Sequence, residues 1–401
     1  MRRLLLAPVL ATAFAVLPAS GQADPLALSR EIGTSGIAAT AARLSDLPAP
    51  SPEELFAAAG LRFLGGIEQA LQLRWQTGLE ADWSELPILR LPIPANPSPR
   101  PFTGADLEAM LQGVSDRMEA AREPLGRIDG DFGLEIDLAD LWFDINANGA
   151  RDPGEDLTEV AGIALGLRGM GAAAPGQVVI RFDGSDAAWL EAYSHLLGGL
   201  SKLALAYGPA EAADRILNAT EQMHALWGDT PPPNAWDMMF GKQVDRIAII
   251  LKALEQKPDA ALAASAYTDF QAVIAANRRF WTLVMAETDD DREWVPNEGQ
   301  TSALGIRLPP GTIAHWQGVL AEAEQLLQGE ILMPHWRYGA EAGISLKKLF
   351  DDPPPVDLVG MIQGEALLPY AEKGRIMSGQ AWSDFERLMQ GEAVLFAVFF
   401  N

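Results

Sequence analysis

Apolar side chains recur at intervals of three and four residues along most of this chain, and that spacing restricts it to a mainly helical fold. One face of the segment 185–208 shows the pattern clearly, with Trp189, Tyr193, Leu196, Leu197, Leu200 and Leu203. The same spacing predicts further helices over 51–78, 103–122, 242–256, 259–287, 312–331 and 380–396. We therefore expect a multi-helical globular body.

Side-chain caps predict where three of these helices begin. Ser51 precedes Pro52 and stands three residues before Glu54, which together form a capping box with proline at the first helical position. Thr103 stands in the same relation to Asp106. Asp183 or Ser185 can cap the helix that follows them.

Other stretches lack helical spacing. Residues 24–50 are rich in Ala, Ser and Pro with weak periodicity, and we expect a loosely ordered N-terminal arm there. The prolines of 86–102 forbid helix and predict an extended connector, with a possible boundary within the 51–401 domain at 90–102.

The period changes to two between residues 131 and 183. Leu134, Ile136 and Leu138 alternate with Glu135 and Asp137, which predicts a short half-buried strand. A second strand is predicted over 177–182, and the two can pair around the intervening loop. The fold class predicted is mainly α, with a small inserted β element.

Residues 1–23 have the order of a cleaved secretory signal. Arg2 and Arg3 precede a short apolar run interrupted by Pro8, and Gly21 and Ala23 suit a cleavage site before Asp24. The run is too short to span a bilayer comfortably, and no later segment is apolar and long enough to do so. We expect a periplasmic or secreted protein without membrane insertion. Because the chain has no cysteine, a lipid anchor on cysteine, disulfides and a thiol nucleophile are all excluded.

The charge balance narrows the class of partner. The formal charge is −24, and removing residues 1–23 takes away two arginines and no acid, which makes it −26. Nucleic acids and anionic membrane surfaces are polyanions, so such a chain is not expected to bind them. An excess of acidic residues instead favours cations as binding partners.

The segment 144–155 carries oxygen-bearing side chains at alternating positions. Calcium takes about 6 to 8 oxygen ligands, so a loop that binds it must curl around the ion. Gly149 supplies a sharp turn in the middle of the segment. The predicted ligands are Asp144, Asn146, Asn148, the backbone carbonyl of Ala150, Asp152 and Glu155.

Over these twelve residues the sequence resembles an EF-hand-type calcium loop, with every ligand position of that pattern filled. It departs from the family because a strand is predicted before the loop, and because Arg151 replaces the aliphatic residue that joins paired loops. We therefore expect a single strand–loop–helix unit with a structural calcium ion. The alternative is an Asx-rich surface turn, which the same residue types favour.

Three further segments could carry chemistry. The run 287–293 contains Glu287, Asp289, Asp290, Asp291 and Glu293, and it could bind a second cation or be a solvated loop. Asp183 and Asp186 could be ligands or acid–base groups, or they could cap a helix. His335, Trp336 and Arg337 suit an anionic or sugar-like ligand, although an isolated histidine is usually structural.

These three segments also resemble parts of a group of uncharacterised exported bacterial proteins, a resemblance that implies no particular activity. Nucleophile, P-loop and dinucleotide motifs are missing from the chain. The function expected is that of an exported calcium-binding protein. A calcium-supported hydrolase using Asp or Glu acid–base chemistry and a periplasmic ligand-binding module stay open as alternatives.

Overall fold

The computed structural model describes residues 24–79, 90–162, 178–226 and 235–399. The predicted signal peptide and the first residue of the second predicted strand lie outside these ranges. Within them the chain is mainly helical, as its spacing predicts. No described helix combines the length and the apolar character needed to cross a membrane.

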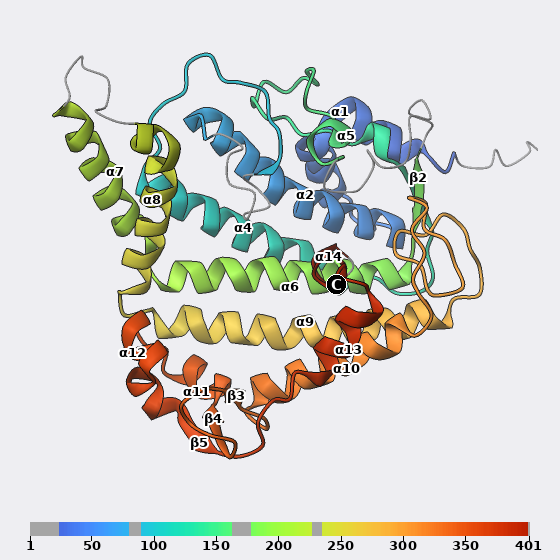
Figure 1. The fold of residues 1–401 in the computed structure, drawn as a ribbon. Coiled ribbons are helices and arrows are strands. Elements are labelled where there is room, and N and C mark those ends of the chain that lie inside the picture. Colours follow the sequence, from blue (N-terminus) through green and yellow to red (C-terminus); the bar gives the residue numbers. More distant parts are fainter. Residues whose placement is uncertain (1–23, 80–89, 163–177, 227–234, 400–401) are drawn as a thin grey trace, which may run out of the picture.

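The longest helices form stacked layers (Figure 1). α6 (Gly184–Ala206) and α9 (Ala260–Ala286) run antiparallel across the middle of the molecule and pack against each other. α4 (Gly104–Leu125) covers α6, and α2 (Pro52–Thr77) covers α4. On the other side, α10 (Thr312–Gln328) packs against α9 and α13 (Gln380–Leu388), and α14 (Ala393–Phe399) follows. α7 (Pro209–Ala225) and α8 (Ala235–Leu254) form a pair at one edge.

The predicted helix starts are confirmed. Ser51 Oγ accepts a hydrogen bond from the Glu54 amide while the Glu54 carboxylate accepts one from the Ser51 amide. Thr103 and Asp106 make the same reciprocal pair at the start of α4. Asp183 caps α6. These caps satisfy amide groups that the first helical turn leaves without partners.

The segment predicted as a loosely ordered arm is instead a helix, so that prediction is wrong. α1 (Ala27–Ser45) bends at Gly36, whose φ of 80° interrupts the helix, and it packs against α2. Its buried face mixes Ile32, Ile37 and Leu44 with small polar residues. The kink and the polar residues on that face hide the helical spacing from a sequence reading.

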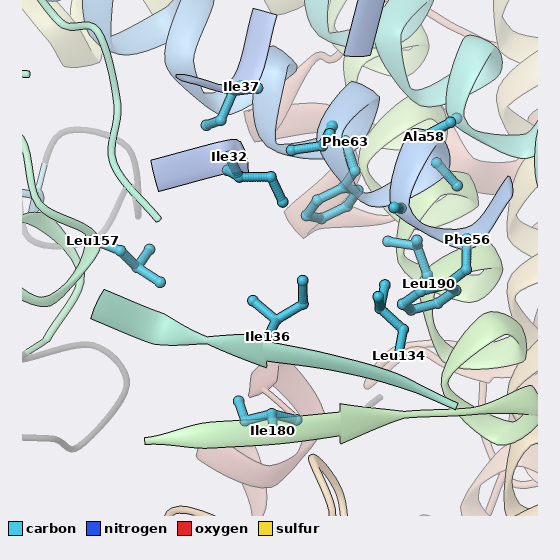
Figure 2. Packing of buried hydrophobic residues seen from close by; sticks show 14 of the residues in the cluster. Ile32, Ile37, Phe56, Ala58, Phe63, Leu134, Ile136, Leu157, Ile180 and Leu190 are labelled. Atoms are coloured by element: carbon cyan, nitrogen blue, oxygen red, sulfur yellow. The ribbon is translucent and has the colours of Figure 1, made fainter. Parts of the chain in front are cut away.

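Both predicted strands form and pair. β1 (Leu134–Asp137) lies antiparallel to β2 (Val179–Phe182), with Ile136 opposite Ile180. Between them come a short 3-10 helix (Leu138–Asp140), the 144–155 loop and a single turn, α5 (Leu157–Val160). Figure 2 shows Ile136 and Ile180 facing the apolar side chains of α1 and α2, among them Ile32 and Phe63. The β element is therefore part of the first hydrophobic core.

A second β element was not predicted. β3 (Met333–Pro334), β4 (Ala342–Ile344) and β5 (Ala371–Lys373) form an antiparallel sheet whose strands are too short to leave a period in the sequence. α11 (Leu346–Asp351), α12 (Leu358–Gln363) and a 3-10 helix (Glu365–Tyr370) surround it. A second large core lies between α9, α10, α13 and α14.

Candidate functional site

The two ends of the 144–155 loop are joined by backbone pairing. Trp142 and Asp156 form an antiparallel bridge, and the Phe143 amide donates to the Glu155 carbonyl at 2.9 Å. The flanking residues Phe143 and Leu157 are buried in the first core. The loop is therefore closed at its base and fixed to the body of the protein.

Side-chain oxygens inside the loop accept hydrogen bonds from its own backbone. The Asp144 carboxylate takes the amides of Asn148 at 3.0 Å and Gly149 at 2.9 Å. Asn146 Oδ1 accepts from the Asn148 amide, and Asn148 Oδ1 from the Ala150 amide. Gly149 has a φ of 76°, which suits glycine. The alternating acceptors curl the loop, as an Asx-rich turn and a calcium loop both require.

Glu155 is fully buried and closes the loop from its C-terminal end. Its Oε1 accepts from the amides of Ile145 at 2.9 Å and Asn146 at 3.3 Å, and its Oε2 accepts from the Asp152 amide at 2.9 Å. A carboxylate offers about four lone pairs, so these three bonds leave acceptor capacity on Glu155.

Asp152 is where the side chains of the loop meet. Its Oδ2 accepts from the side-chain amides of Asn146 and Asn148, both at 2.8 Å. Oxygen ligands bound to one calcium ion at about 2.3 to 2.6 Å stand roughly 3 Å from one another. Rotating an Asn side-chain amide by half a turn puts its oxygen where its nitrogen now lies, so Asn146 and Asn148 could each present an oxygen beside Asp152. These tips therefore already have the spacing of neighbouring ligands.

Helix α2 holds the first residue of the loop. Glu68 Oε2 accepts from the Asp144 amide at 2.9 Å, and Gln72 Nε2 donates to the Asp144 carbonyl at 2.8 Å. Burial raises the pKa of Glu68 to about 7, and the negative charges of Asp144 and Glu155 add to that effect. Sequence spacing gave no signal for Glu68, because its partner lies 76 residues away.

Arg151 turns back onto its own unit. Its Nε donates to Asp156 at 2.6 Å and its Nη2 donates to the Ala139 carbonyl at 2.8 Å. The position that joins paired EF-hand loops therefore carries an ion pair with the residue directly after this loop.

The donor chemistry of the loop fits calcium, since all five side chains offer hard oxygen ligands. In this structure, however, these side-chain oxygens accept hydrogen bonds from other groups of the same loop. Within the described residues, no three His, Cys, Asp or Glu side chains lie together in a way that could hold a metal ion. A calcium site here would depend on the amide oxygens of Asn146 and Asn148 as well as on the carboxylates.

The structure joins two of the other segments that the sequence analysis singled out. Asp183 and Asp186, at the start of α6, lie beside Glu287 and Glu293, which follow α9. We call these four residues the acid cluster. Asp186 also accepts from the Asp183 amide at 2.9 Å, so it is a cap as well as a member of the cluster. Gln300 Nε2 donates to Glu287 Oε2 at 3.2 Å, whereas Glu287 Oε1 is buried without a hydrogen-bond partner.

Three carboxyl groups of the acid cluster have raised pKa values. Burial raises the pKa of Asp186 well above its usual range and that of Glu287 to about 7, and the charge of Asp183 acts in the same direction on both. Burial and Asp183 also raise the pKa of Glu293. The rest of the run turns outward: Asp290 accepts from the Thr301 amide, and Asp291 pairs with Arg292.

The His335–Trp336–Arg337 segment lies in the turn between β3 and β4. His335 Nε2 contacts the Met361 carbonyl at 3.1 Å, and Trp336 Nε1 donates to the Ile362 carbonyl at 2.9 Å. The Arg337 guanidinium lies over the Trp336 ring, 5.3 Å from its centroid. The turn is therefore attached to the end of α12. It lies in a different part of the molecule from β2 and the acid cluster beside it (Figure 1).

A buried polar network was missed by the sequence analysis. Asp269 of α9 binds His195 Nδ1 at 2.7 Å and Lys202 Nζ at 2.8 Å, both on α6, and lies 3.7 Å from Arg122 Nη2 on α4. The sequence shows only that His195 and Lys202 are seven residues apart on one helix. Their shared partner, Asp269, lies more than 60 residues away from both.

Comparison with known proteins adds no further constraint on this site: no protein-family model, no curated protein and no solved structure matches the chain.

Proposed function

We propose that this chain is an exported calcium-binding protein in which the ion fixes the 144–155 loop to the helical body. One observation carries the proposal. Every second residue from Asp144 to Asn148 turns a side-chain oxygen toward the inside of one closed loop, and Asp152 and Glu155 complete the set. Hard oxygen donors at this spacing are the ligands that calcium prefers.

The expected affinity follows from the ligand charges. Three of the five side-chain ligands are carboxylates, and extracellular calcium sites commonly bind with Kd values of about 10⁻⁴ to 10⁻³ M. An ion that binds only the folded state stabilises it by about 2.7 kcal/mol when its concentration is 100 times Kd. Because the loop is bonded to α2 and flanked by buried core residues, that stabilisation would reach the whole first core.

The test is a thermal melt of the mature chain after chelation, with calcium or magnesium then added back. Calcium is expected to raise Tm and magnesium to raise it much less, because magnesium demands a tighter octahedral site. Asp152→Asn keeps an oxygen for both amide donors but removes a charge, so the chelated Tm should stay unchanged while the calcium response falls.

Asp156→Asn is the matched control. Asp156 lies four residues after Asp152 and directly after the loop, where it pairs with Arg151. It is not one of the predicted ligands. Its calcium response should equal that of the wild type. Equal Tm values with and without calcium would instead identify the segment as an Asx-rich turn.

A ligand-binding module is the second candidate, and a cavity favours it. A space of about 300 Å³ lies between α1, α2 and α4, within the size range of small-ligand sites. Arg117 is exposed at its edge and can face a ligand carboxylate, while Glu68, whose pKa is about 7, lies on its wall and can accept a hydrogen bond from a ligand ammonium group, so the cavity suits an amino acid. Calorimetric titration with a panel of amino acids tests this role. Binding that Arg117→Ala abolishes would support it, and no heat change would reject it.

A further inference from the structure

The outer face of α8 is apolar and exposed. Six large side chains on this helix keep between 43% and 68% of their surface exposed: Trp236, Met239, Phe240, Val244, Ile247 and Ile250. We call these six residues the α8 stripe. The end of α7 adds Met223 and Leu226, at 50% and 85%. Together they are eight of the 17 large apolar side chains that are exposed in the described residues, so the exposed apolar surface is concentrated at this edge.

The spacing of the stripe places it on one side of the helix. At 3.6 residues per turn, positions 236, 239, 240, 244, 247 and 250 fall within one broad arc. The opposite side of α8 faces α7, where Thr220 Oγ1 donates to Asp245 Oδ2 at 3.0 Å. Trp236 and Phe240 stack on each other at 5.2 Å, so the stripe is itself an ordered surface. A helix that is apolar on its solvent side has the pattern of a helix in a bundle.

Local charge favours a second copy of the chain over an anionic surface. The chain as a whole has a formal charge of −24, but α7 and α8 together carry four basic residues against five acidic ones, so this edge is almost neutral. Two copies can therefore approach each other along α8 without the repulsion that the rest of their surfaces would produce. An anionic lipid surface would meet the full negative charge of the body around it.

The area of the stripe is sufficient for a dimer. Covering an aromatic side chain completely buries about 150 to 250 Å². The six aliphatic and methionine side chains here are smaller, but several are more than half exposed, so each of the eight contributes on the order of 100 Å². The six residues of the stripe with Met223 and Leu226 then supply on the order of 800 Å² per copy, the size of a standard specific interface. Two helical pairs that meet in this way form a four-helix bundle.

We propose that the mature chain forms a two-fold symmetric dimer through the α8 stripe, with the two copies of α8 antiparallel. This inference does not depend on calcium binding. The stripe runs from 236 to 250, so a two-fold axis that covers it fully passes close to residue 243, and Val244 of the two copies then lies near that axis.

The mass of the protein in solution, measured by light scattering over a range of concentrations, tests the proposal. The wild type should have twice the monomer mass. Val244→Glu combined with Ile247→Glu places like charges at the centre of the interface and should weaken association at least about 100-fold. The matched control is Val359→Glu with Ile362→Glu on α12, where the side chains are 78% and 66% exposed, and this variant should remain a dimer.

Cross-linking tests the antiparallel register without relying on a disruptive variant. Because the chain has no cysteine, a single introduced cysteine reports only on its own position. Val244→Cys should form a disulfide-linked dimer under mild oxidation. Trp236→Cys should not. In the antiparallel dimer residue 236 lies opposite residue 250 of the other copy, so the two introduced cysteines are 14 residues apart, or about 21 Å along the helix. A monomeric wild type, whether free or sedimenting with phosphatidylglycerol vesicles, or a dimer that survives the double Glu variant, would overturn the proposal.

Discussion

Helices α6 and α9 hold buried carboxylates at two places that differ in their electrostatic surroundings. In the middle of the pair, Asp269 faces His195 and Lys202, with Arg122 near by. At the end of the pair, Asp186 faces the carboxylates of the acid cluster. Asp269 and Asp186 are equally buried, with 4% and 3% of their surface exposed.

The pKa values of these two aspartates nevertheless shift in opposite directions. Burial acts on both by raising the pKa, but at Asp269 the hydrogen bonds from His195 and Lys202 outweigh it and the pKa is lowered. At Asp186 the neighbouring acids add to the effect of burial, and the pKa is raised. At Asp269 the cationic and hydrogen-bonding neighbours therefore decide the direction of the shift, whereas at Asp186 burial is the main cause and the neighbouring acids add to it.

The largest effect is expected from Asp269→Ala. Removing the carboxylate leaves His195, Lys202 and Arg122 close together without their shared anion, and breaking a buried ion pair in this way typically costs about 3 to 5 kcal/mol. Urea unfolding should show a loss of that size in the free energy of unfolding.

Glu191→Ala is the matched control for that variant. Glu191 pairs with Arg279 and so links the same two helices, but this pair is much more exposed to solvent, with 54% of the Arg279 side chain and 29% of the Glu191 side chain accessible. Exposed ion pairs contribute about 0 to 1 kcal/mol, so the control should stay within that range. A loss equal to that of Asp269→Ala would show that the network has no special role in joining α6 to α9.

The acid cluster predicts a pH dependence of stability. The folded pKa of Glu287 is about 7, against an ordinary value of 4.5, so the folded state binds more protons than the unfolded state between these pH values. Its contribution to stability is complete below about pH 4.5 and is lost as the pH rises through 7. Glu287→Gln removes this loss and should stabilise the protein at pH 8 by roughly 1 to 2 kcal/mol. This figure is reduced to allow for the partial exposure of Glu287 to solvent.

The measurement is urea unfolding of the wild type and Glu287→Gln at pH 4 and pH 8. At pH 4 Glu287 is mostly protonated in both the folded and the unfolded protein, so the two curves should nearly coincide. The difference between the proteins, rather than the wild-type curve alone, isolates this group, because Glu68 also has a raised pKa of about 7. A variant that is less stable than the wild type at pH 8 would contradict the assignment.

The sequence predicted what local patterns determine. Helix starts at Ser51, Thr103 and Asp183 followed from caps that act over three residues, and the β1–β2 pair followed from alternation on either side of a loop. Helix α1 was missed because Gly36 kinks it and small polar residues share its buried face. The β3–β4–β5 sheet was missed because two or three residues cannot establish a period.

The sites divide in the same way. The closure of the 144–155 loop is a local property, and its acceptors lie where their alternate spacing places them, while calcium binding by the loop stays a prediction. The acid cluster and the Asp269 network join residues 67 or more positions apart. No spacing rule reaches that far, so the sequence could name Asp183 and Glu287 separately but could not bring them together.

The smallest effect is expected from Asp183→Ser, which tests whether charge within the acid cluster causes the raised pKa values. Serine keeps the cap of α6, because its hydroxyl can accept the amide hydrogen bond that Asp183 Oδ1 now accepts from Ser185 at 2.8 Å. The negative charge facing Asp186, Glu287 and Glu293 is lost. The pKa of Glu287, followed by NMR titration, should fall toward its ordinary value, and stability at pH 8 should rise by about 0.5 kcal/mol. An unchanged pKa would mean that burial alone raises it, and the contrast with Asp269 would then rest on the cations around Asp269 rather than on repulsion within the cluster.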